Sequence, residues 1–426
     1  MSKRLQIDYV RVNKVQFGQK TSLEEGVLTV CKEELIDLVK NELFGTLDIK
    51  LAVPGESCRI LGIHDIMQPR CKAEAPETSY PGIWGKLAPM GEGRTVALKG
   101  VVVYAKCNIK YYMDMGGPCA KYTHFSKHYH VILDATPAEG VTDASYAEAL
   151  KHASLTINVY LAKLAIGQKP DETEEFEMGP VGPGKDGKPL PKVAYLVTHM
   201  ASHDTWNFLV YGQSAIGFLP TILQPTEILD GAMVWRYWEP NYYLQNEVYL
   251  KELLRRHGKD IEFVGVVFAN NVMKIDGKDT MGMMAATLCK ETLKADCVII
   301  NKSGMGHCQL DSALAFNWAE KMGMTCVMNL SAVSNDKPGD MLVISDSKID
   351  AVVNSGRNYD LNHPRVERVI GEGTNVPSLM GVDVYGPFTH TTNFAYQGIW
   401  SQLGDCYVTT DSDLPEVPQT NGKEES

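Results

Sequence analysis

Residues 208–270 read FLVYGQSAIGFLPTILQPTEILDGAMVWRYWEPNYYLQNEVYLKELLRRHGKDIEFVGVVFAN. This stretch joins an aromatic-rich segment, Trp235–Tyr243, to an amphipathic helical pattern over Val248–Arg256 and then to a continuous apolar run that ends at Asn270. The apolar run has the length of a strand and does not alternate with polar residues. A strand that is apolar on both faces is typical of a parallel sheet covered by helices.

The same unit recurs along the second half of the chain. Strand-length apolar runs are VAYLV (193–197), IEFVGVVFAN (261–270), ADCVIINKSG (295–304), TCVMNLSAV (325–333) and IDAVVNSG (349–356). Helices are predicted between them at Val248–Arg256, Met281–Leu293 and Leu310–Met322. This alternation predicts the α/β class, with a doubly wound, mostly parallel, Rossmann-like sheet domain over residues 193–410.

The first part of the chain has a different pattern. Its short β-like runs are LQIDYVRV, GVLTV, LDIKLAV, CRILGI, TVALKGVVVYA and YHVILDA, and helices are predicted at Glu33–Leu43 and Ser145–Ile166. Residues 1–166 are therefore expected to form a β-rich α+β domain. Residues 167–192 are charged and rich in Gly and Pro, which predicts a linker or mobile loop, and residues 411–426 form a polar tail.

Composition excludes several classes of protein. The chain has 426 residues, of which 44% are hydrophobic and 22% charged, so it is neither disordered nor membrane-spanning in composition. A net charge of −11 argues against nucleic acid and anionic membranes as partners. The ten cysteines include no CxxC pair and are expected to be reduced thiols. We expect a cytoplasmic protein without a targeting segment.

Polar residues and glycines gather where the predicted parallel strands end. They are His199, His203, Asn270, Asn271, Ser303–Cys308, Ser334 and Asn354–Asn358. In an open parallel sheet the ligand crevice lies beyond the carboxyl ends of the strands. We therefore expect substrate binding and chemistry at this edge, with Asn354 among the substrate-binding residues.

Two histidines and an aspartate follow the first of these strands. His199 and His203 are four residues apart, which places both imidazoles on one face of a helix. Asp204 could orient the imidazole of His203 for acid–base catalysis, and His199 could serve as a metal ligand. Alternatively, His203 and Asp204 cap the next element.

The segment Ser303-Gly-Met-Gly-His-Cys308 lies between a predicted strand and a predicted helix. Backbone N–H groups around Ser303, Gly304 and Gly306 could bind a substrate carboxylate or a phosphate at the helix N-terminus. Cys308 could act there as a catalytic thiolate. The alternative is a tight turn that is followed by a small buried thiol.

Three further histidines lie close together at His124, His128 and His130. On a strand all three would point to the same face, because even numbers of residues separate them. Three imidazoles on one face could bind a divalent metal such as zinc or iron. The alternative is a polar surface on which each histidine pairs with a neighbour.

The aromatic run contains Trp235 and Trp238. These rings could form part of a substrate pocket for a methylated ammonium group through cation–π contacts. Aromatic runs also occur in cores and subunit interfaces. Both interpretations are open from the sequence.

Several short motifs occur in a fixed order along both halves of the chain. They are VQFG (15–18), GVL (26–28), KEEL (32–35), PGES-RI (54–60), GRT--LKG (93–100), YT-FSK (122–127), VYG (210–212), LPT (219–221), PTEILDGAM (225–233) and RHGKD-EFVGV (256–266). They resemble, in matching order, the component B alpha/beta proprotein of clostridial glycine, sarcosine and betaine reductases. His203-Asp204 before VYG and the glycines of the 303–306 loop also resemble that family, whereas His307, Cys308 and the three histidines at 124–130 depart from it.

The resemblance implies a cofactor that the protein makes from its own backbone. In that family an internal cysteine preceded by asparagine, shortly after the DGA motif, self-cleaves to leave a pyruvoyl group. Here residues 234–243 contain no cysteine, and none of the ten cysteines follows an asparagine. We therefore expect an uncleaved chain without a pyruvoyl group, with Asn354-Ser355 as the one Asn-Ser pair from which a serine-derived group could arise.

The resemblance also implies a reaction and a partner. The family binds an amine as a Schiff base on the pyruvoyl carbonyl, and a selenocysteine- or cysteine-bearing subunit then breaks the C–N bond. We expect a hetero-oligomeric subunit that acts on a small amine or amino-acid-like substrate by C–N or related C–X cleavage, with metal assistance and a gamma-like partner. The alternatives are a non-catalytic structural subunit and a hydrolase that uses Cys308 with a nearby histidine.

Overall fold

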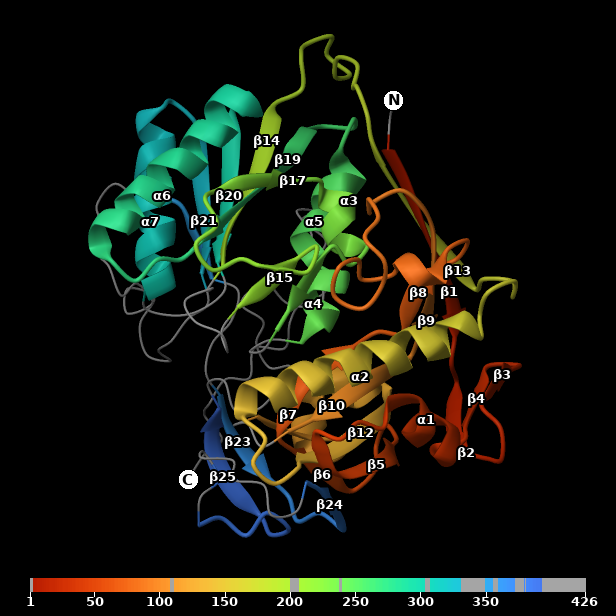
Figure 1. Ribbon diagram of the computed structural model, residues 1–426. Helices are drawn as coiled ribbons and strands as arrows, with labels where there is room; N and C mark the ends of the chain where they lie inside the picture. Colours follow the sequence, from red (N-terminus) through yellow and green to blue (C-terminus); the bar gives the residue numbers. More distant parts are fainter. Residues whose placement is uncertain are drawn as a thin grey trace.

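The computed structural model describes residues 3–107, 111–199, 207–236, 240–302, 307–330, 349–354, 359–371, 379 and 381–392. Figure 1 shows the parallel-sheet part of the chain at the top, β1 and β13 at its right-hand side, and α2 with β5, β7, β10 and β12 below, beside the blue C-terminal strands.

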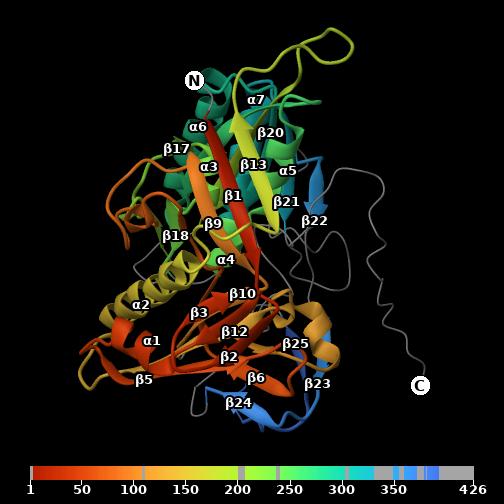
Figure 2. The same ribbon diagram turned by 90° about the vertical axis from the view of Figure 1, so that its right-hand side faces the viewer.

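One N-terminal sheet has the order β13-β1-β9-β8. Its strands are β1 (Lys3–Arg11), β8 (Arg70–Lys72), β9 (Gly93–Lys99) and β13 (Glu172–Met178). β1 is parallel to β9 and antiparallel to β13. Figure 2 shows these three strands side by side. The predicted strand over residues 95–105 is in fact two strands in different sheets, because the chain turns at Gly100, whose φ is 92°.

The second N-terminal sheet has the order β5-β12-β10-β7, and two helices pack on it. Its strands are β5 (Phe44–Ala52), β7 (Ile63–Met67), β10 (Val101–Lys106) and β12 (Tyr129–Pro137), and the helices here are α1 (Lys32–Val39) and α2 (Asp143–Lys163). Helix α2 begins after Thr142, whose hydroxyl accepts a hydrogen bond from the Ser145 N–H. Its residues Leu150 and Ile157 pack in one core cluster with Val101 and Val103 of β10.

Shorter elements complete the fold. They are β2 (Lys14–Phe17), β3 (Ser22–Glu24), β4 (Val27–Val30), β6 (Cys58–Leu61), β11 (Tyr112–Asp114), β15 (Phe208–Val210), β16 (Gln213–Ser214), β18 (Met233–Trp235), β23 (Tyr359–His363), β24 (Arg368–Ile370) and β25 (Phe388–Thr392), with the short helical turns η1 (Pro76–Thr78), η2 (Pro118–Tyr122) and η3 (Phe125–Lys127).

The second half of the chain forms a six-stranded sheet with the order β17-β19-β14-β20-β21-β22. Its strands are β14 (Lys192–His199), β17 (Thr221–Leu223), β19 (Glu262–Asn270), β20 (Cys297–Lys302), β21 (Thr325–Leu330) and β22 (Val352–Asn354). All neighbours are parallel except β17, which runs antiparallel to β19. The large, mostly parallel sheet predicted from the apolar runs is confirmed.

Helices lie on both faces of this sheet. They are α3 (Pro225–Leu229), α4 (Asn241–Gln245), α5 (Val248–Arg256), α6 (Ile275–Thr287) with its π-helical extension η4 (Leu288–Thr292), and α7 (His307–Lys321). Alternate residues of β14 enter different cores: Tyr195 lies in the cluster that contains Leu250 of α5, and Leu196 in the cluster that contains Phe316 of α7. Figure 1 shows α6 and α7 on one face and α5 on the other. Burial on both faces explains the unbroken apolar runs.

Two segments differ from the predicted domain limits. Glu172–Met178 lies inside the predicted linker but forms β13, where Phe176 packs into the core and most of the acidic side chains remain exposed. The chain from Tyr359 was assigned to the parallel-sheet domain, yet β24 pairs with β6 and Leu361 packs with Leu61 and Tyr112.

The polar tail at 411–426 lies outside the described residues. Among the helices that are described, none is long and apolar enough to cross a membrane.

Candidate functional site at the carboxyl edge of the parallel sheet

The central strands of the sheet bring polar residues together at their carboxyl ends. His199 of β14 is in register with Asn270 of β19, and Thr198 is in register with Lys302 of β20. The N–H of Asn271 donates to the carbonyl of His199 over 2.9 Å. β14 lies between β19 and β20, so the helices that follow these two neighbours start from the same edge.

His199 is enclosed by aromatic rings. Its imidazole lies 4.0 Å from the ring of Phe208, 5.2 Å from Phe268 and 5.5 Å from Trp235, measured between ring centroids. Burial lowers the pKa of His199 well below its ordinary value, so the ring is neutral at physiological pH. A neutral imidazole can bind a metal or donate a hydrogen bond, but it supplies no positive charge to an anionic substrate.

A buried ion pair joins the first turns of α6 and α7. Lys278 Nζ lies 2.5 Å from Asp311 Oδ2, and both side chains are at most 5% exposed. Burial nevertheless raises the pKa of Asp311 to about 6, because the Lys278 ammonium and backbone N–H donors only partly offset the loss of water. Asp311 can therefore hold a proton near neutral pH, as a general acid requires.

Cys308 does not have the properties predicted for a catalytic thiolate. Its side chain is fully buried in the first turn of α7. Burial raises its pKa to about 12, although Lys302 and Lys278 act in the opposite direction. Because the apolar surroundings outweigh both lysines and the helix N-terminus, the thiol stays protonated. This geometry also contradicts the premise of a Cys308-based hydrolase.

A small cavity lies between the sheet and helices α3–α5. Its volume is about 10 Å³, enough for a single water molecule, and its lining includes Tyr195, His199, Met233, Leu244 and Glu247. The cavity therefore lies between His199, at the carboxyl end of β14, and Met233 and Leu244, which flank the cysteine-free segment 234–243. Among the lining residues, Tyr195, His199 and Glu247 are those with side chains that carry oxygen or nitrogen.

Glu247 is a buried carboxyl group at the N-terminus of α5. It accepts hydrogen bonds from the Leu250 N–H and, over 2.9 Å, from the Tyr195 hydroxyl. The contacts continue across the sheet through Asn301, whose Nδ2 donates to the Tyr195 hydroxyl, to Asn329. Burial raises the pKa of Glu247 to about 8, in spite of these donors. The carboxyl is thus mainly protonated at pH 7.

The three histidines at 124–130 do not share a strand face. His124 and His128 flank the η3 turn, and only His130 lies in β12. His124 Nε2 lies 2.9 Å from the Tyr242 hydroxyl, His128 Nδ1 lies 3.2 Å from the carbonyl of His124, and His130 Nε2 lies 2.9 Å from the carbonyl of Phe125. The premise of alternating strand positions was therefore wrong, because the chain turns between His124 and His128.

The pKa values of these histidines are lowered by burial, to about 3 for His124 and His130 and about 4 for His128. All three rings are neutral at physiological pH. In the part of the chain that the structure describes, they do not form a group whose ligand atoms converge on one metal position. Their contacts match the alternative in which each ring pairs with a neighbour.

Trp235 belongs to the core. It is fully buried, its ring centroid lies 3.5 Å from that of Phe208, and its backbone N–H donates to Asn241 Oδ1 over 2.7 Å. Asn241 in turn donates to both carboxylate oxygens of Asp65. These contacts link Trp235 and Asn241, near the two ends of the cysteine-free segment 234–243, to each other and to β7. They place Trp235 in the core and not in an open substrate pocket.

The DGA motif has a structural role at the junction of the two halves. Asp230 accepts hydrogen bonds from Thr95 Oγ1 at 2.5 Å, Lys72 Nζ at 2.8 Å and the Gly91 N–H at 2.9 Å. Gly91 has a φ of 87°, and a Cβ there would lie 2.7 Å from the Glu227 N atom. The motif therefore ties α3 to β8 and β9.

Several predicted site residues lie outside the described residues. They are His203, Asp204, Trp238, Ser303, Gly304 and Gly306. Asn354 ends β22 at the predicted edge, and its backbone alone is described. The roles predicted for these residues remain predictions.

Sequence reasoning missed Glu247, Lys278 and Asp311. Glu247 directly precedes the predicted helix Val248–Arg256, which is a signal for an N-cap and not for a buried acid. Lys278 and Asp311 lie 33 residues apart, and their pairing depends on how α6 packs on α7. The sequence contains no local signal for that contact.

Comparisons with known proteins agree with the motifs. Residues 3–385 match the family model for glycine/sarcosine/betaine reductase component B subunits. The "Glycine reductase complex component B subunits alpha and beta" of Peptoclostridium acidaminophilum is 33% identical over 395 residues, covering 89% of this chain and 91% of that protein. The "Sarcosine reductase complex component B subunit alpha" of the same organism is 32% identical over 402 residues, 89% of this chain and 91% of the relative.

The "Betaine reductase complex component B subunit alpha" of Peptoclostridium acidaminophilum is 29% identical over 390 residues, which cover 87% of this chain and 88% of the relative. No solved structure matches the chain. The similarity to these relatives therefore extends over both the N-terminal sheets and the parallel-sheet part.

Proposed function

Because the chain belongs to the family of glycine/sarcosine/betaine reductase component B subunits, we propose that it binds a small amine or amino-acid-like substrate at the carboxyl edge of the parallel sheet. The reaction there is cleavage of a C–N or related C–X bond, carried out with a thiol- or selenol-bearing gamma-like subunit. The relatives are named as components of reductase complexes, which supports a hetero-oligomer.

The strand order supports this location. We infer a doubly wound, Rossmann-like arrangement in which the order reverses between β14 and β20, as the sequence β19-β14-β20-β21-β22 suggests. In such sheets the crevice forms where neighbouring connections leave in opposite directions. His203 and Asp204, which follow β14 in the sequence, remain the proposed acid–base pair, with Ser303, Gly304 and Gly306 as substrate-binding residues.

The buried pair of Lys278 and Asp311 is the observation that carries the proposal. Attack by the partner's thiolate on carbon forms a C–S bond while the C–N bond breaks, and the electron pair of the broken bond stays on nitrogen. The departing amine then needs a proton. Asp311 can supply it, because burial raises its pKa to about 6. Lys278 restores the charge balance when the carboxylate forms.

We further propose that the chain acts without cleavage and without a pyruvoyl group. The segment after the DGA motif has no cysteine, and Asn241 bridges its two ends by contacts to Trp235 and Asp65. No step is assigned to a metal on His124, His128 and His130, because each ring contacts a neighbouring group.

A non-catalytic subunit is the second candidate. The burial of Cys308 and Trp235, two residues predicted to take part in chemistry, favours it. In that case the carboxyl edge would contact the partner subunit and not a substrate. The two candidates differ in whether Asp311 affects turnover of the assembled complex.

The first experiment is an intact mass of the purified full chain. We expect a single polypeptide of 47.1 kDa. Two fragments, one with a blocked N-terminus, would overturn the proposal of an uncleaved subunit.

The second experiment measures amine or ammonia release from small amines by the chain together with its thiol-bearing partner and a dithiol reductant. Asp311→Asn should lower the rate by at least roughly 100-fold, the usual contribution of a general acid. Asp260→Asn, which changes an exposed acid in the turn after α5, is the matched control and should leave the rate unchanged. Equal rates for both variants would favour the non-catalytic subunit.

A further inference from the structure

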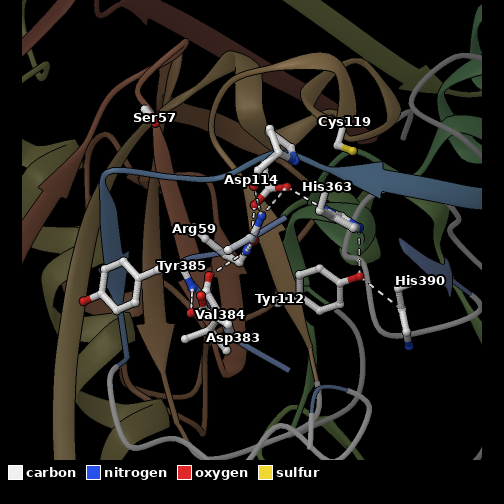
Figure 3. Close-up of polar contacts among 12 residues, drawn as sticks. Ser57, Arg59, Tyr112, Asp114, Cys119, His363, Asp383, Val384, Tyr385 and His390 are labelled. Carbon is white, nitrogen blue, oxygen red and sulfur yellow. Dashed lines mark hydrogen bonds and ion pairs between the residues drawn. The ribbon is translucent and has the colours of Figure 1, made fainter. Parts of the chain in front are cut away.

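A second group of ionisable side chains lies where the C-terminal strands meet the N-terminal part. Asp114 comes from β11, Cys119 from η2 and His363 from β23, more than 240 residues further along the chain. One ligand atom of each residue lies within 4.8 Å of the other two, and all three residues are buried. Figure 3 shows Asp114 and His363 pointing toward each other, with Cys119 beside them.

We propose that Asp114, Cys119 and His363 bind one divalent metal ion of the zinc class. A carboxylate oxygen, a thiolate and an imidazole nitrogen are all common zinc ligands. A thiolate also selects against magnesium and calcium, which prefer oxygen. Three protein ligands leave one position of a tetrahedral site for a further ligand.

Neighbouring side chains hold the imidazole and the carboxylate in place. His363 Nδ1 lies 2.6 Å from Asp114 Oδ2, and His363 Nε2 lies 3.0 Å from the Tyr112 hydroxyl. With the metal on Nδ1, the Nε2–H group would donate to Tyr112. Arg59 Nε donates to the other carboxylate oxygen of Asp114 over 2.6 Å. Hydrogen bonds of this kind fix the tautomer of a ligand histidine and the direction of a ligand carboxylate.

The charges also define the further ligand. Metal binding requires the Cys119 thiol, which now donates to the Asn362 carbonyl over 3.2 Å, to release its proton to solvent. Among the described residues, the metal, two anionic ligands and the Arg59 guanidinium then sum to one net positive charge, in a site whose protein ligands are buried. An anion in the fourth position, such as hydroxide or a small carboxylate, would neutralise this charge.

The site would join two distant parts of the chain. Arg59 already donates to the carbonyls of Pro364 and Val384, over 2.9 and 2.6 Å, so β6 and β11 are linked to the C-terminal segment without a metal. Apolar residues surround the group: Leu61, Leu361, Val366 and Val369 pack in one cluster with Cys119. A metal ion there would stabilise the packing of β23 on the N-terminal part, because the three ligands are far apart in the unfolded chain.

The test uses the full chain, freed of metal by a chelator and then dialysed against limiting Zn²⁺ or Co²⁺. We expect one metal ion per chain and, with Co²⁺, the absorption of thiolate-to-cobalt charge transfer. The cobalt spectrum requires no variant, so it is informative even if a substitution prevents folding. A wild-type chain that takes up no metal, or binds cobalt without the thiolate band, would overturn the proposal.

Variants identify the ligands. Cys119→Ala and His363→Gln should each abolish stoichiometric binding, and Tyr112→Phe should weaken it by roughly 10- to 100-fold, as loss of a supporting hydrogen bond does. Cys71→Ala, a buried cysteine of β8, and His128→Gln, from the group predicted by sequence spacing, are matched controls that should keep the metal. Loss of metal in His128→Gln with retention in Cys119→Ala would contradict the proposal.

Discussion

Two regions of the molecule each contain a buried aspartate that is paired with a cation. One is the carboxyl edge of the parallel sheet, and the other, called the junction below, is where β23 and β24 meet β6 and β11. The two aspartates differ in their cationic partners. At the junction, Asp114 receives both a guanidinium and an imidazole, with the shortest contacts at 2.6 Å. At the edge, Asp311 receives one ammonium from Lys278, and burial raises its pKa to about 6. The two places therefore differ in the number of cationic groups that the described residues bring to the carboxyl, and at the edge burial outweighs the ammonium.

The largest expected effect concerns the other carboxyl at the edge. Glu247 has a pKa of about 8 in the folded chain against 4.5 for the ordinary group, so the folded state binds its proton more tightly. Stability should therefore fall as pH rises from about 4.5 to about 8, by about 5 kcal/mol in total at 1.36 kcal/mol per unit. Glu247→Gln should lose this dependence, as measured by urea unfolding at pH 5 and pH 8. Identical slopes for both chains would show that Glu247 has an ordinary pKa.

Removing the cation at the junction should have the next largest effect. Arg59→Met removes the guanidinium that contacts the buried Asp114 carboxylate and also removes donors to the carbonyls of Pro364 and Val384. The expected loss is about 3–5 kcal/mol of unfolding free energy, the cost of breaking a buried ion pair. Arg255→Met is the control, since the side chain of Arg255 is 48% exposed in its pair with Glu252, and it should cost less than about 1 kcal/mol. Similar losses in both variants would remove the distinction between the two environments.

The third prediction returns to the edge. The pKa of Asp311 is about 6 when folded and 3.8 ordinarily, so the wild-type chain should lose about 3 kcal/mol of stability as pH rises from about 4 to about 6. Asp311→Asn should lack this part of the pH dependence, although it also leaves Lys278 without its partner. The comparison is therefore between slopes, measured by denaturant unfolding at closely spaced pH values. A steeper fall in the variant would contradict the assignment.

A matched pair of small changes sharpens the comparison. Tyr112→Phe removes a hydroxyl that contacts His363 at 3.0 Å and His390 at 3.1 Å, whereas Tyr242→Phe removes a hydroxyl that contacts His124 at 2.9 Å. The first should cost about 1–3 kcal/mol and the second about 1 kcal/mol, because the junction loses two hydrogen-bond partners. Thermal unfolding of metal-free protein measures both. A larger loss in Tyr242→Phe would place the stronger network at the 124–130 histidines.

Much of the fold could be predicted from local pattern. The strands in the parallel sheet and the helix Val248–Arg256 follow from apolar periodicity, which is set by whether one or both faces of an element are buried. The sequence did not reveal β13, because four of its seven residues are glutamates and its only apolar residues, Phe176 and Met178, come at its end. It also gave no sign that β24 would pair with β6 across more than 300 residues.

The positions of several polar residues at the strand ends could be predicted better than their protonation. The carboxyl edge follows from strand direction, and His199, Asn270 and Asn271 were expected there. For Cys308 the sequence left open a catalytic thiolate or a small buried thiol, and complete burial, which raises its pKa to about 12, matches the buried thiol. Spacing alone cannot show how much apolar surface encloses a group, and that enclosure decides its protonation.

The sequence by itself determined the family and the parallel strands, because short motifs and apolar runs are local properties of the chain. Only the tertiary structure decided which charges meet: Lys278 with Asp311, Arg59 with Asp114, and Asp114 with His363 across 249 residues. The physical reason is that ion pairing and desolvation depend on distances of a few ångströms in space, which residue numbers do not encode.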